Sequence, residues 1–454
     1  MSASSAPSSS RPSRGDVLEL TVDRLAYGGN GVARRDGYVV FVAGGMPGDR
    51  VRAEVGKAKR GYAEARAVEI LEPGPDRIEP VADHPGAPWQ VLPYERQLEV
   101  KQEQVLDALT RIGRLEGFEL APIVGAVEQW RYRNKLEYSF GTGDDAALVC
   151  GFHAPGRFDR IEPMGDCKLA SVRGNELREA VLAFCREHSL GAWDRRTQAG
   201  FLRNVVIREG RRTGQFQVRL VTSPGDLDAA AFASAIEADG VLWTQTGSLG
   251  ESTQGGTTQL LRGSAQLMDD LGDLRFLISP EAFFQTNTEM AEQLYAIAAE
   301  LAGLRGSEQV FDLYCGIGTI GLSVASRARQ VVGVELIESA VADAIENARL
   351  NEIENASFFA GDIRTSMREL VERVGRPDVC LIDPPRAGLS AKVVRRVIEA
   401  GPSRIVYVSC NPTTLAPNAA QLVEAGWALR RVQPVDMFPQ TPHIECVALL
   451  EKAA

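Results

Sequence analysis

Four short apolar runs in the C-terminal part of the chain constrain its fold more than any other feature. These runs span residues 310–311, 331–334, 379–382 and 405–408. Continuous apolar runs without alternating polar residues are typical of parallel strands that are buried on both faces of a sheet. The stretches between them include segments of helical character, at 339–350, 366–374 and 391–400. From about Ser279 onward, the sequence therefore predicts a doubly wound α/β sheet, which binds ligands where its strands end.

The N-terminal part has a different pattern. Residues 15–71 alternate apolar and polar positions in short bursts that are separated by glycines. This pattern predicts four or five short strands that close into a small β-barrel. We therefore expect a disordered tail at 1–14, a barrel at 15–73, a central mixed α+β domain at 74–275 and the α/β domain at 276–454. A helix is expected at 95–113, where it can pack on the α/β domain.

Charge excludes one class of protein and leaves others open. The 454-residue chain has a net charge of −10, which argues against a surface covered in positive charge for nonspecific nucleic-acid binding. Residues 49–66 nevertheless hold six basic side chains against three acidic ones. A second basic group lies along a predicted hairpin and consists of Arg203, Arg208, Arg211, Arg212 and Arg219. Either group could contact RNA or form an ordinary solvated surface.

The seven cysteines are irregularly spaced and form neither a disulfide framework nor paired metal-ligand motifs. A reducing cytoplasm is therefore the expected location. No apolar run in the sequence is long enough to cross a bilayer. Each cysteine then needs its own explanation, and packing is sufficient for Cys315, Cys380 and Cys446, which lie within or beside apolar runs.

A glycine-rich loop follows the first apolar run, with Gly316, Gly318 and Gly321 in G-x-G-x-x-G spacing. Glycines at this spacing let the backbone approach a ligand closely, and Glu335 at the end of the next predicted strand can accept hydrogen bonds from ribose hydroxyls. Nicotinamide cofactors and S-adenosylmethionine share these needs. Asp312 ahead of the loop favours S-adenosylmethionine, whose methionine end is positively charged, because a carboxylate there would repel a pyrophosphate. A purely structural glycine turn is the remaining alternative.

A cysteine and a carboxylate near the C-terminus indicate the chemistry. Cys410 follows the last apolar run in Ser409-Cys410-Asn411-Pro412, and Glu445 ends the motif His443-Ile444-Glu445. A thiolate that adds to carbon 6 of uracil makes carbon 5 nucleophilic, so that carbon 5 can accept a methyl group. A base must then remove the carbon 5 proton before the thiolate leaves. Cys410 could serve as the nucleophile, Glu445 as the base, and Gln285 as a hydrogen-bond partner of the enolate oxygen.

The chain resembles the RNA uracil-5-methyltransferase family, including the RNA-binding TRAM barrel that some members carry. The resemblance rests on Tyr132-Arg-Asn-Lys135, Ile278-Ser-Pro-Glu-Ala-Phe-Phe-Gln285, Asp312-Leu-Tyr-Cys-Gly316, Asp383-Pro-Pro-Arg386, Ser409-Cys-Asn-Pro412, His443-Ile-Glu445 and, in the barrel, Tyr27-Gly-Gly-Asn-Gly-Val32. It implies that Cys410 is the nucleophile and Glu445 the proton-abstracting base. It also implies S-adenosylmethionine as the cofactor, bound by Gln285, Tyr314, Thr319, Glu335, Asp362 and Asp383.

One departure from that family concerns a metal cluster. Many members hold an iron-sulfur cluster with three closely spaced cysteines after the barrel and a fourth in the central domain. Here the corresponding stretch, Asp83-His-Pro-Gly-Ala-Pro-Trp-Gln90, contains no cysteine, and Cys167 stands at the fourth position. One ligand cannot hold a cluster. We therefore expect neither an iron-sulfur cluster nor another metal, and expect Pro85, Pro88 and Trp89 to stiffen and pack this segment.

Other interpretations stay open. Asp383-Pro384-Pro385 also resembles the catalytic loop of adenine amino-methyltransferases, but Arg386 occupies the place where an aromatic residue would stack on the base. A cytosine-5 enzyme would use similar chemistry from a different motif, and a noncatalytic RNA-binding protein could retain the scaffold. The barrel and the central domain suit a folded RNA whose target base is flipped out into the pocket. Ribosomal RNA is favoured over transfer RNA, because TRAM-bearing relatives include large-subunit rRNA enzymes, and we expect a monomer.

Overall fold

The computed structural model describes residues 11–157, 159–250 and 252–453. Its contacts divide the chain into two compact units. The first unit contains the chain up to Asp83 together with Ala87–Asp107 and Phe438–His443, and the second contains His84–Gly86, Ala108–Met437 and Ile444–Ala454. Most of the tail predicted at 1–14 lies outside the described residues. None of the described helices is both long and apolar enough to span a membrane.

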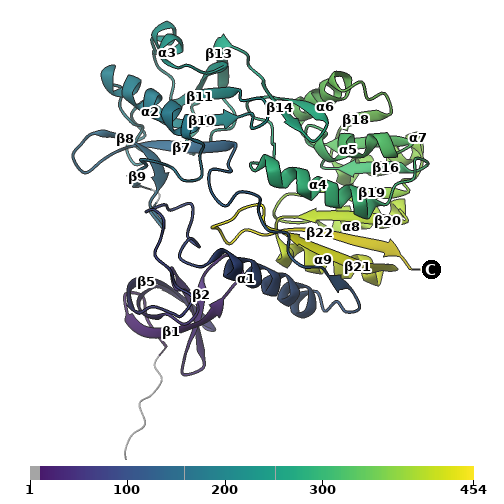
Figure 1. Ribbon diagram of the computed structural model, residues 1–454, viewed down its shortest axis with the longest axis horizontal. Coiled ribbons are helices and arrows are strands. Elements are labelled where there is room, and N and C mark those ends of the chain that lie inside the picture. Colours follow the sequence, from purple (N-terminus) through teal and green to yellow (C-terminus); the bar gives the residue numbers. More distant parts are fainter. Residues whose placement is uncertain (1–10, 158, 251, 454) are drawn as a thin grey trace, which may run out of the picture. The chain divides into compact units, whose positions relative to one another are not determined.

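The N-terminal strands form a closed barrel, as the alternating pattern predicts. Its strands are β1 (Val17–Leu25), β2 (Gly31–Arg35), β3 (Tyr38–Ala43), β4 (Arg50–Ala58) and β5 (Tyr62–Glu72), in the order β1-β2-β3-β5-β4 (Figure 1). Successive side chains of a strand alternate between its two faces, so every second residue points into the barrel. The barrel core includes Leu18, Leu20, Val22, Val40 and Val42.

The rest of the first unit packs around the buried indole of Trp89. Helix α1 (Tyr94–Asp107) contributes to this cluster, whose buried members are Leu25, Met46, Trp89, Leu92 and Val100. The segment Phe438–His443 joins the unit through Gln440, whose backbone N–H donates to Oε1 of Gln97 at 2.9 Å. The Gln97 side chain donates in turn to Oε1 of Gln440 at 2.8 Å. A segment from near the C-terminus is thus anchored on α1.

The central part of the second unit is a seven-stranded sheet, counted over the described residues. In sheet order its strands are β13 (Thr257–Gly263), β12 (Gly240–Gln245), β11 (Phe216–Thr222), β10 (Leu202–Glu209), β7 (Lys135–Thr142), β8 (Leu148–His153) and β9 (Ile161–Pro163). Helices α2 (Val172–Glu187) and α3 (Ala229–Ala235) pack against it (Figure 1). The hairpin of β14 (Leu267–Leu271) and β15 (Leu274–Ile278) follows. This arrangement is the mixed α+β fold that the sequence predicts.

Three of the five arginines singled out on the β10–β11 hairpin are buried. Arg203, Arg208 and Arg219 are only 7%, 3% and 1% exposed. Arg211 and Arg212, near the turn, form ion pairs with acidic side chains. The expectation that this group faces RNA or solvent is therefore wrong for the three buried arginines. Strand periodicity assigns side chains to one face of a sheet, but it does not reveal which distant segments cover that face.

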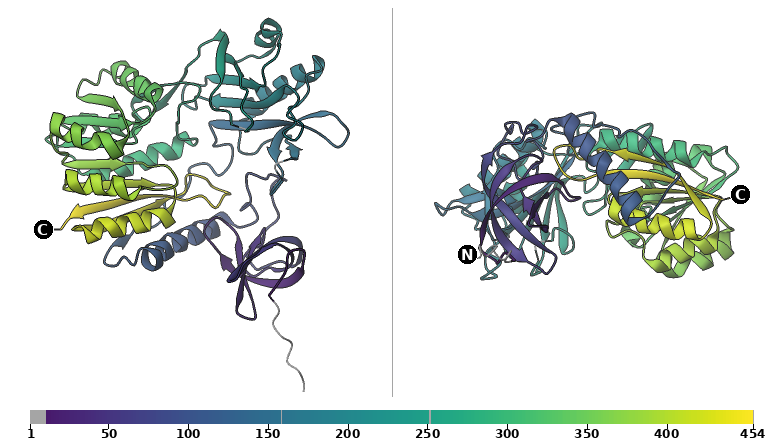
Figure 2. Two further views of the ribbon diagram at one scale, coloured as in Figure 1. Left: turned by 180° about the vertical axis from the view of Figure 1, so that it is seen from behind. Right: turned by 90° about the horizontal axis from the view of Figure 1, so that it is seen from below.

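The C-terminal part forms an eight-stranded sheet within the described ranges. Its order is β18 (Ala356–Ala360), β17 (Gln330–Glu335), β16 (Gln309–Leu313), β19 (Val379–Ile382), β20 (Arg404–Ser409), β22 (Glu445–Lys452), β21 (Trp427–Val435) and β6 (Glu119–Leu120). The first five strands are parallel, and β22 is antiparallel to both neighbours. Helices flank the sheet on both faces (Figure 2). They are α4 (Thr288–Ala302), α5 (Thr319–Val324), α6 (Glu338–Leu350), α7 (Ile363–Val374), α8 (Ala391–Ala400) and α9 (Pro412–Glu424).

The predicted doubly wound fold is confirmed. The four apolar runs become β16, β17, β19 and β20, which are neighbours in one sheet. The chain leaves β16 toward one edge of the sheet and returns on the other side at β19, so the strand order reverses between these two strands. Open α/β sheets bind ligands at such a reversal, outside the carboxyl ends of the strands. Asp312 on β16 and Asp383 just after β19 lie at this place. The domain bounds expected above stay predictions.

Candidate active site

Strand register brings Cys410 and Glu445 together. In the antiparallel pair of β20 and β22, Ser409 lies opposite Cys446. Cys410 directly follows β20, and Glu445 is the first residue of β22. The charge of Glu445 contributes to the raised pKa of Cys410, so the two side chains lie close together. The predicted nucleophile and the predicted base are thus neighbours at the end of two paired strands.

The turn that carries Cys410 is held by hydrogen bonds on both sides. The Ser409 hydroxyl accepts from the backbone N–H of Asn411 at 3.2 Å. The Asn411 side-chain oxygen caps α9 by accepting from the backbone N–H of Thr413 at 3.0 Å, and its amide donates to the Arg386 carbonyl at 3.2 Å. The half-buried Cys410 therefore lies in a defined strand-to-helix turn that is tied to the loop after β19.

Both groups of the predicted catalytic pair favour their neutral forms. Burial raises the pKa of Cys410 to about 11, with further contributions from Glu445 and Asp383, while Arg386 acts in the opposite direction. Glu445 is 4% exposed, and burial followed by the charge of Asp383 raises its pKa well above the usual value. A positive charge in this place would favour the thiolate and the carboxylate. The pair is therefore complementary to a cationic ligand.

Asp312 and Asp383 add two more carboxyl groups with raised pKa values. One oxygen of Asp312 accepts from the backbone N–H of Gly321 at 2.9 Å, whereas its Oδ1 is buried without a partner among the described residues. Burial raises the pKa of Asp312 to about 7, and burial together with the charge of Asp312 does the same for Asp383. A buried acceptor without a donor is costly. Asp312 and Asp383 therefore fit a ligand that carries positive charge or hydrogen-bond donors, such as the methionine end of S-adenosylmethionine.

The glycine-rich loop needs its glycines for close packing. A Cβ at Gly321 would lie 2.7 Å from Asp312 Oδ2, and Gly318 caps α5 with φ of +88°. Tyr314, ahead of the loop, also has a positive φ of 65°. This backbone strain in a non-glycine residue is typical of functional sites.

The Glu335 carboxylate, at the end of β17, accepts hydrogen bonds from three backbone N–H groups. Its Oε1 accepts from the backbone N–H groups of Leu336 at 2.7 Å and Ile337 at 3.0 Å, and its Oε2 accepts from Gly316 at 3.2 Å. A carboxylate has about four lone-pair positions, so one remains for a ribose hydroxyl. The side chains of Leu336 and Ile337 are 65% and 58% exposed, and they offer an apolar surface beside the loop that the sequence analysis did not single out.

A buried tyrosine that the sequence analysis missed joins two of the predicted cofactor residues. Thr319 donates a hydrogen bond to the hydroxyl of Tyr295 on α4 at 3.2 Å. Gln285 lies beside the same hydroxyl and lowers its pKa, whereas burial and then the charge of Asp383 raise it. Tyr295 is 5% exposed, and its apolar neighbours at helical spacing gave it the pattern of a core residue. Gln285, Thr319 and Asp383 are thus grouped around one hydroxyl.

Asp362 lies at the edge of this group. It caps α7 by accepting from the backbone N–H of Arg364 at 2.8 Å, and it forms an ion pair with the Arg364 side chain. Burial and then the charge of Asp362 raise the pKa of Tyr314, while Arg364 lowers it. Asp362 therefore lies near Tyr314, but its carboxylate is already engaged by an arginine.

Cys167 has a histidine partner. Its Sγ lies 3.1 Å from Nε2 of His84, and the His84 ring lies 5.6 Å from the ring of Phe152. Among the residues that the structure describes, no three His, Cys, Asp or Glu side chains gather as a metal site. The expectation that this chain holds no iron-sulfur cluster stays a prediction.

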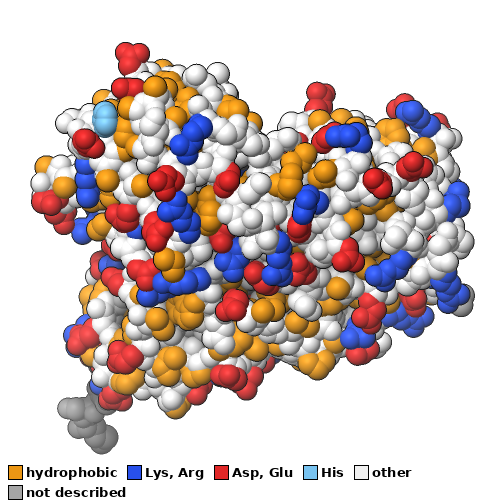
Figure 3. Space-filling view, turned by 45° about the horizontal axis from the view of Figure 1, so that its top comes forward, with side chains coloured by type: hydrophobic (Ala, Val, Ile, Leu, Met, Phe, Trp, Pro, Cys, Tyr) orange, Lys and Arg blue, Asp and Glu red, His pale blue; other side chains and the backbone are white. Residues whose placement is uncertain are grey.

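The surface carries charges of both signs. Figure 3 shows one face of the molecule, on which Lys and Arg side chains are interspersed with Asp and Glu side chains. On the barrel, several basic side chains of the segment 49–66 form ion pairs: Arg50 with Glu72, Arg52 with Glu19 and Glu69, and Lys57 with Glu64. The local basic footprint is therefore weaker than the residue count indicates.

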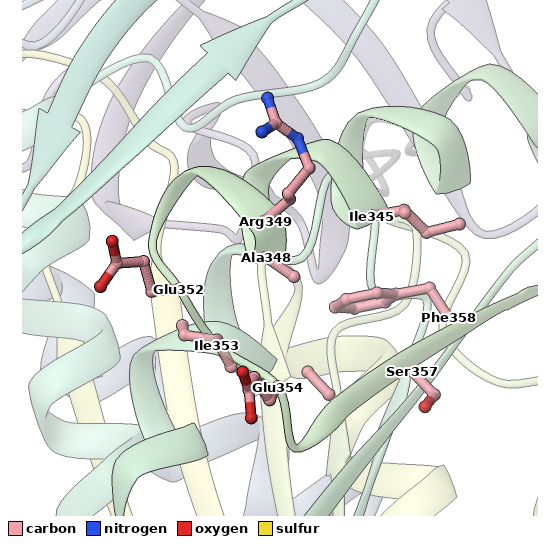
Figure 4. Close-up of a pocket in the computed structure, with 9 residues that line it drawn as sticks. Ile345, Ala348, Arg349, Glu352, Ile353, Glu354, Ser357 and Phe358 are labelled. Carbon is pink, nitrogen blue, oxygen red and sulfur yellow. The ribbon is translucent and has the colours of Figure 1, made fainter.

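An open groove lies away from the predicted site. It is bordered by the end of α6 and the start of β18, and its wall includes Ile345, Ala348, Ile353 and Phe358 (Figure 4). The groove adjoins the amino end of β18, whereas the predicted site residues follow the carboxyl ends of the strands. It is therefore separate from the candidate active site.

Comparisons with known proteins agree with this geometry. The TRAM domain family matches residues 12–68, and the family described as tRNA (Uracil-5-)-methyltransferase matches residues 268–453. An RNA methyltransferase of Bacteroides thetaiotaomicron is 39% identical over 94% of this chain and all of its own length. One from Halalkalibacterium halodurans is 38% identical, over 96% of this chain and 97% of its own.

A solved structure extends the likeness to three dimensions. It is the crystal structure of Pyrococcus abyssi tRNA (uracil-54, C5)-methyltransferase in complex with S-adenosyl-L-homocysteine. The two chains are 29% identical, the match covers 95% of this chain and 100% of that one, and the TM-score is 0.78. The chain therefore belongs to the RNA uracil-5-methyltransferase family, and S-adenosylmethionine is its cofactor.

Proposed function

We propose that the protein methylates carbon 5 of a uridine in folded RNA through a transient bond between Cys410 and carbon 6 of the ring. The observation that carries this proposal is that β20 and β22 pair up to Ser409 and Cys446, the residues beside Cys410 and Glu445, and that the charge of Glu445 contributes to the raised pKa of Cys410. Asp383 supports the proposal. Its charge contributes to the raised pKa values of Cys410 and Glu445, so Asp383 lies near both side chains.

In the proposed mechanism, the Cys410 thiolate adds to carbon 6, and the electron pair of the carbon 5–carbon 6 double bond moves toward the oxygen on carbon 4. S-adenosylmethionine supplies the methyl group that carbon 5 accepts. Glu445 then takes the carbon 5 proton, the double bond re-forms, and the thiolate leaves. Glu445 suits this task because burial raises its pKa, which makes its carboxylate a stronger base than an exposed glutamate.

We assign cofactor contacts to Gln285, Tyr314, Thr319, Glu335, Asp362 and Asp383. Glu335 would accept from the ribose, and Asp383 with Asp312 would face the cationic methionine end. Phe283 is a candidate for contact with the target base, because this residue is 67% exposed and lies two residues before Gln285. An exposed aromatic ring can stack on an unpaired base.

An RNA that contains 5-fluorouridine tests the covalent step. Fluorine cannot be removed as a proton, so the enzyme, the RNA and the methyl group should remain joined after one turnover. We expect this adduct with the wild-type protein and S-adenosylmethionine, and none with Cys410→Ala, which should still bind RNA. Absence of an adduct from the wild type, with methyl groups transferred to adenine or cytosine, would contradict the proposal.

The RNA itself is the second part of the proposal. Ribosomal RNA is favoured because TRAM-bearing members of the family include large-subunit rRNA enzymes, whereas the Pyrococcus abyssi protein is a tRNA (uracil-54, C5)-methyltransferase. Mapping of 5-methyluridine in RNA from cells with and without this protein decides between them. Loss of a methylated position from rRNA supports the proposal, and loss from tRNA alone contradicts it. The monomeric state and the cytoplasmic location expected above stay predictions.

A further inference from the structure

One face of the central sheet carries a polar cluster that includes two buried arginines, Arg208 and Arg219. In the register of β7, β10 and β11, Arg208 lies opposite Lys135, and Val206 lies opposite both Glu137 and Arg219. Alternation along each strand therefore places Lys135, Glu137, Arg208 and Arg219 on the same face. Lys135 forms an ion pair with Glu137 at 2.5 Å.

This polar face holds the segment 280–286, which contains Phe283 and Gln285. The Arg208 guanidinium donates to the carbonyl of Pro280 at 3.3 Å and also to the carbonyl of Ala282. Arg219 forms an ion pair with Glu281 at 3.4 Å, and the same Glu281 oxygen accepts from the backbone N–H of Gly255 at 2.8 Å.

Asn134, just before β7, fixes the end of the segment. Its side chain donates to the Gln285 carbonyl at 2.8 Å, and its backbone N–H donates to the Thr286 carbonyl at 2.9 Å. Two neighbouring strands, β10 and β11, and the residue before β7 thus hold the segment on both sides of Phe283. The Phe283 side chain itself remains exposed, and Gln285 reaches the Tyr295 hydroxyl.

The arrangement is costly in electrostatic terms. Lys135, Arg208 and Arg219 lie near the carboxylates of Glu137 and Glu281, and the charge of Asp343 also acts on Arg208. Burial, followed by the charge of Arg219, lowers the pKa of Arg208 to about 10, and burial also lowers the pKa of Lys135 and Arg219. The Nε atoms of Arg208 and Arg219 are buried without a partner among the described residues. Well-packed apolar residues often stabilise a fold as much as buried ions do, so fold stability alone does not account for this cluster.

We propose that Arg208 and Arg219 are positioning residues that hold the segment 280–286 so that Gln285 reaches the cofactor and Phe283 reaches the target base. This inference rests on the proposed function for the target base, and on the cofactor contact assigned to Gln285. Both hydrogen bonds leave one terminal nitrogen of Arg208, Nη2, which is held at the end of a rigid planar group, whereas a lysine ammonium ends a shorter and more flexible stem.

The test is Arg208→Lys, which keeps the positive charge and removes the hydrogen bonds of the guanidinium to the carbonyls of Pro280 and Ala282. Arg212→Lys is the matched control, because Arg212 lies on the same hairpin, is 41% exposed in its side chain and pairs with Glu292. We expect Arg208→Lys to increase amide hydrogen exchange in peptides that cover 280–286, and to weaken S-adenosylhomocysteine binding roughly tenfold, as for the loss of one charge-assisted hydrogen bond. Arg212→Lys should change neither.

A second variant distinguishes a local effect on the segment 280–286 from a general loss of stability. Glu281→Gln keeps the side-chain volume and the acceptor for Gly255, but it removes the ion pair with Arg219. It should raise KM for RNA and leave the melting temperature within the range of the control. Unchanged exchange and ligand affinity in Arg208→Lys would overturn the inference, as would equal effects in Arg212→Lys. Exchange and S-adenosylhomocysteine binding require no RNA, so failure of the 5-fluorouridine experiment would refute the proposed function without removing this result.

Discussion

Charged side chains on the barrel and charged side chains at the strand ends of the C-terminal sheet are held in opposite ways. On the barrel, Arg52 lies between Glu19 and Glu69, and each of these side chains is about half exposed. At the strand ends, Asp312 has a buried oxygen without a partner in the described structure, and the pKa values of Asp312 and Asp383 are raised to about 7. The charged side chains of the barrel have partners within the fold, whereas Asp312 and Asp383 at the strand ends need a ligand.

This contrast explains why the strand ends rather than the basic segment of the barrel identify the activity. Exposed ion pairs contribute little to stability and are screened by salt. A buried group of carboxyls costs free energy until a cation or a set of donors arrives. The C-terminal site therefore gains most of its electrostatic stabilisation when the cofactor binds.

The largest expected effect concerns the cofactor's charge and Cys410. S-adenosylmethionine carries a positive sulfonium that S-adenosylhomocysteine lacks, so only the former should lower the raised pKa of the Cys410 thiol toward neutrality. Because the thiolate is the reactive form, alkylation of Cys410 by iodoacetamide at pH 8 should be roughly tenfold faster with S-adenosylmethionine for each pKa unit of this difference. Peptide mass spectrometry measures the rate at Cys410.

The other six cysteines are buried and serve as internal references for that experiment. Both ligands have nearly the same shape, so steric protection of Cys410 affects the two rates alike. Equal rates at Cys410 with the two ligands would show that the strand-end carboxyls and the thiol do not respond to cofactor charge. That result would contradict the proposed difference between the strand ends and the barrel.

A smaller effect is expected for Tyr295→Phe, which removes one hydroxyl and keeps the ring. Thr319 would lose a hydrogen-bond acceptor, and Gln285 would lose a polar neighbour. Loss of one hydrogen bond at a binding site corresponds to about 0.5–1.5 kcal/mol, so KM for S-adenosylmethionine should rise about two- to tenfold. Steady-state kinetics at saturating RNA measure this change. An unchanged KM would show that the Tyr295 hydroxyl does not contribute to cofactor binding.

The smallest effect is expected on the barrel. Arg52→Ala removes an exposed side chain that pairs with Glu19 and Glu69, so the free energy of unfolding should fall by no more than about 1 kcal/mol. The kcat of methylation should not change. Urea denaturation monitored by circular dichroism measures the stability. A loss of several kcal/mol would show that the barrel charges are coupled as tightly as those at the strand ends.

Local sequence patterns predicted the buried parallel strands of the C-terminal sheet and the residues that follow them. The apolar runs identified β16, β17, β19 and β20, and their fold placed Cys410 where a strand ends. The patterns could not place Tyr295, because a buried tyrosine at helical spacing looks the same whether its hydroxyl meets the core or a cofactor site. They also failed for Arg208 and Arg219, which are buried by a segment that is distant in sequence. Such contacts are set by tertiary packing.

The measurement that tests the central claim most directly uses Glu445→Gln with an ordinary uridine-containing RNA substrate. Without a base to take the carbon 5 proton, the methylated ring should remain bonded to the enzyme. Mass spectrometry of the digested protein should then show the Cys410 peptide carrying a methylated uridine. Wild-type turnover by this variant, or an adduct on any cysteine other than Cys410, would contradict the account.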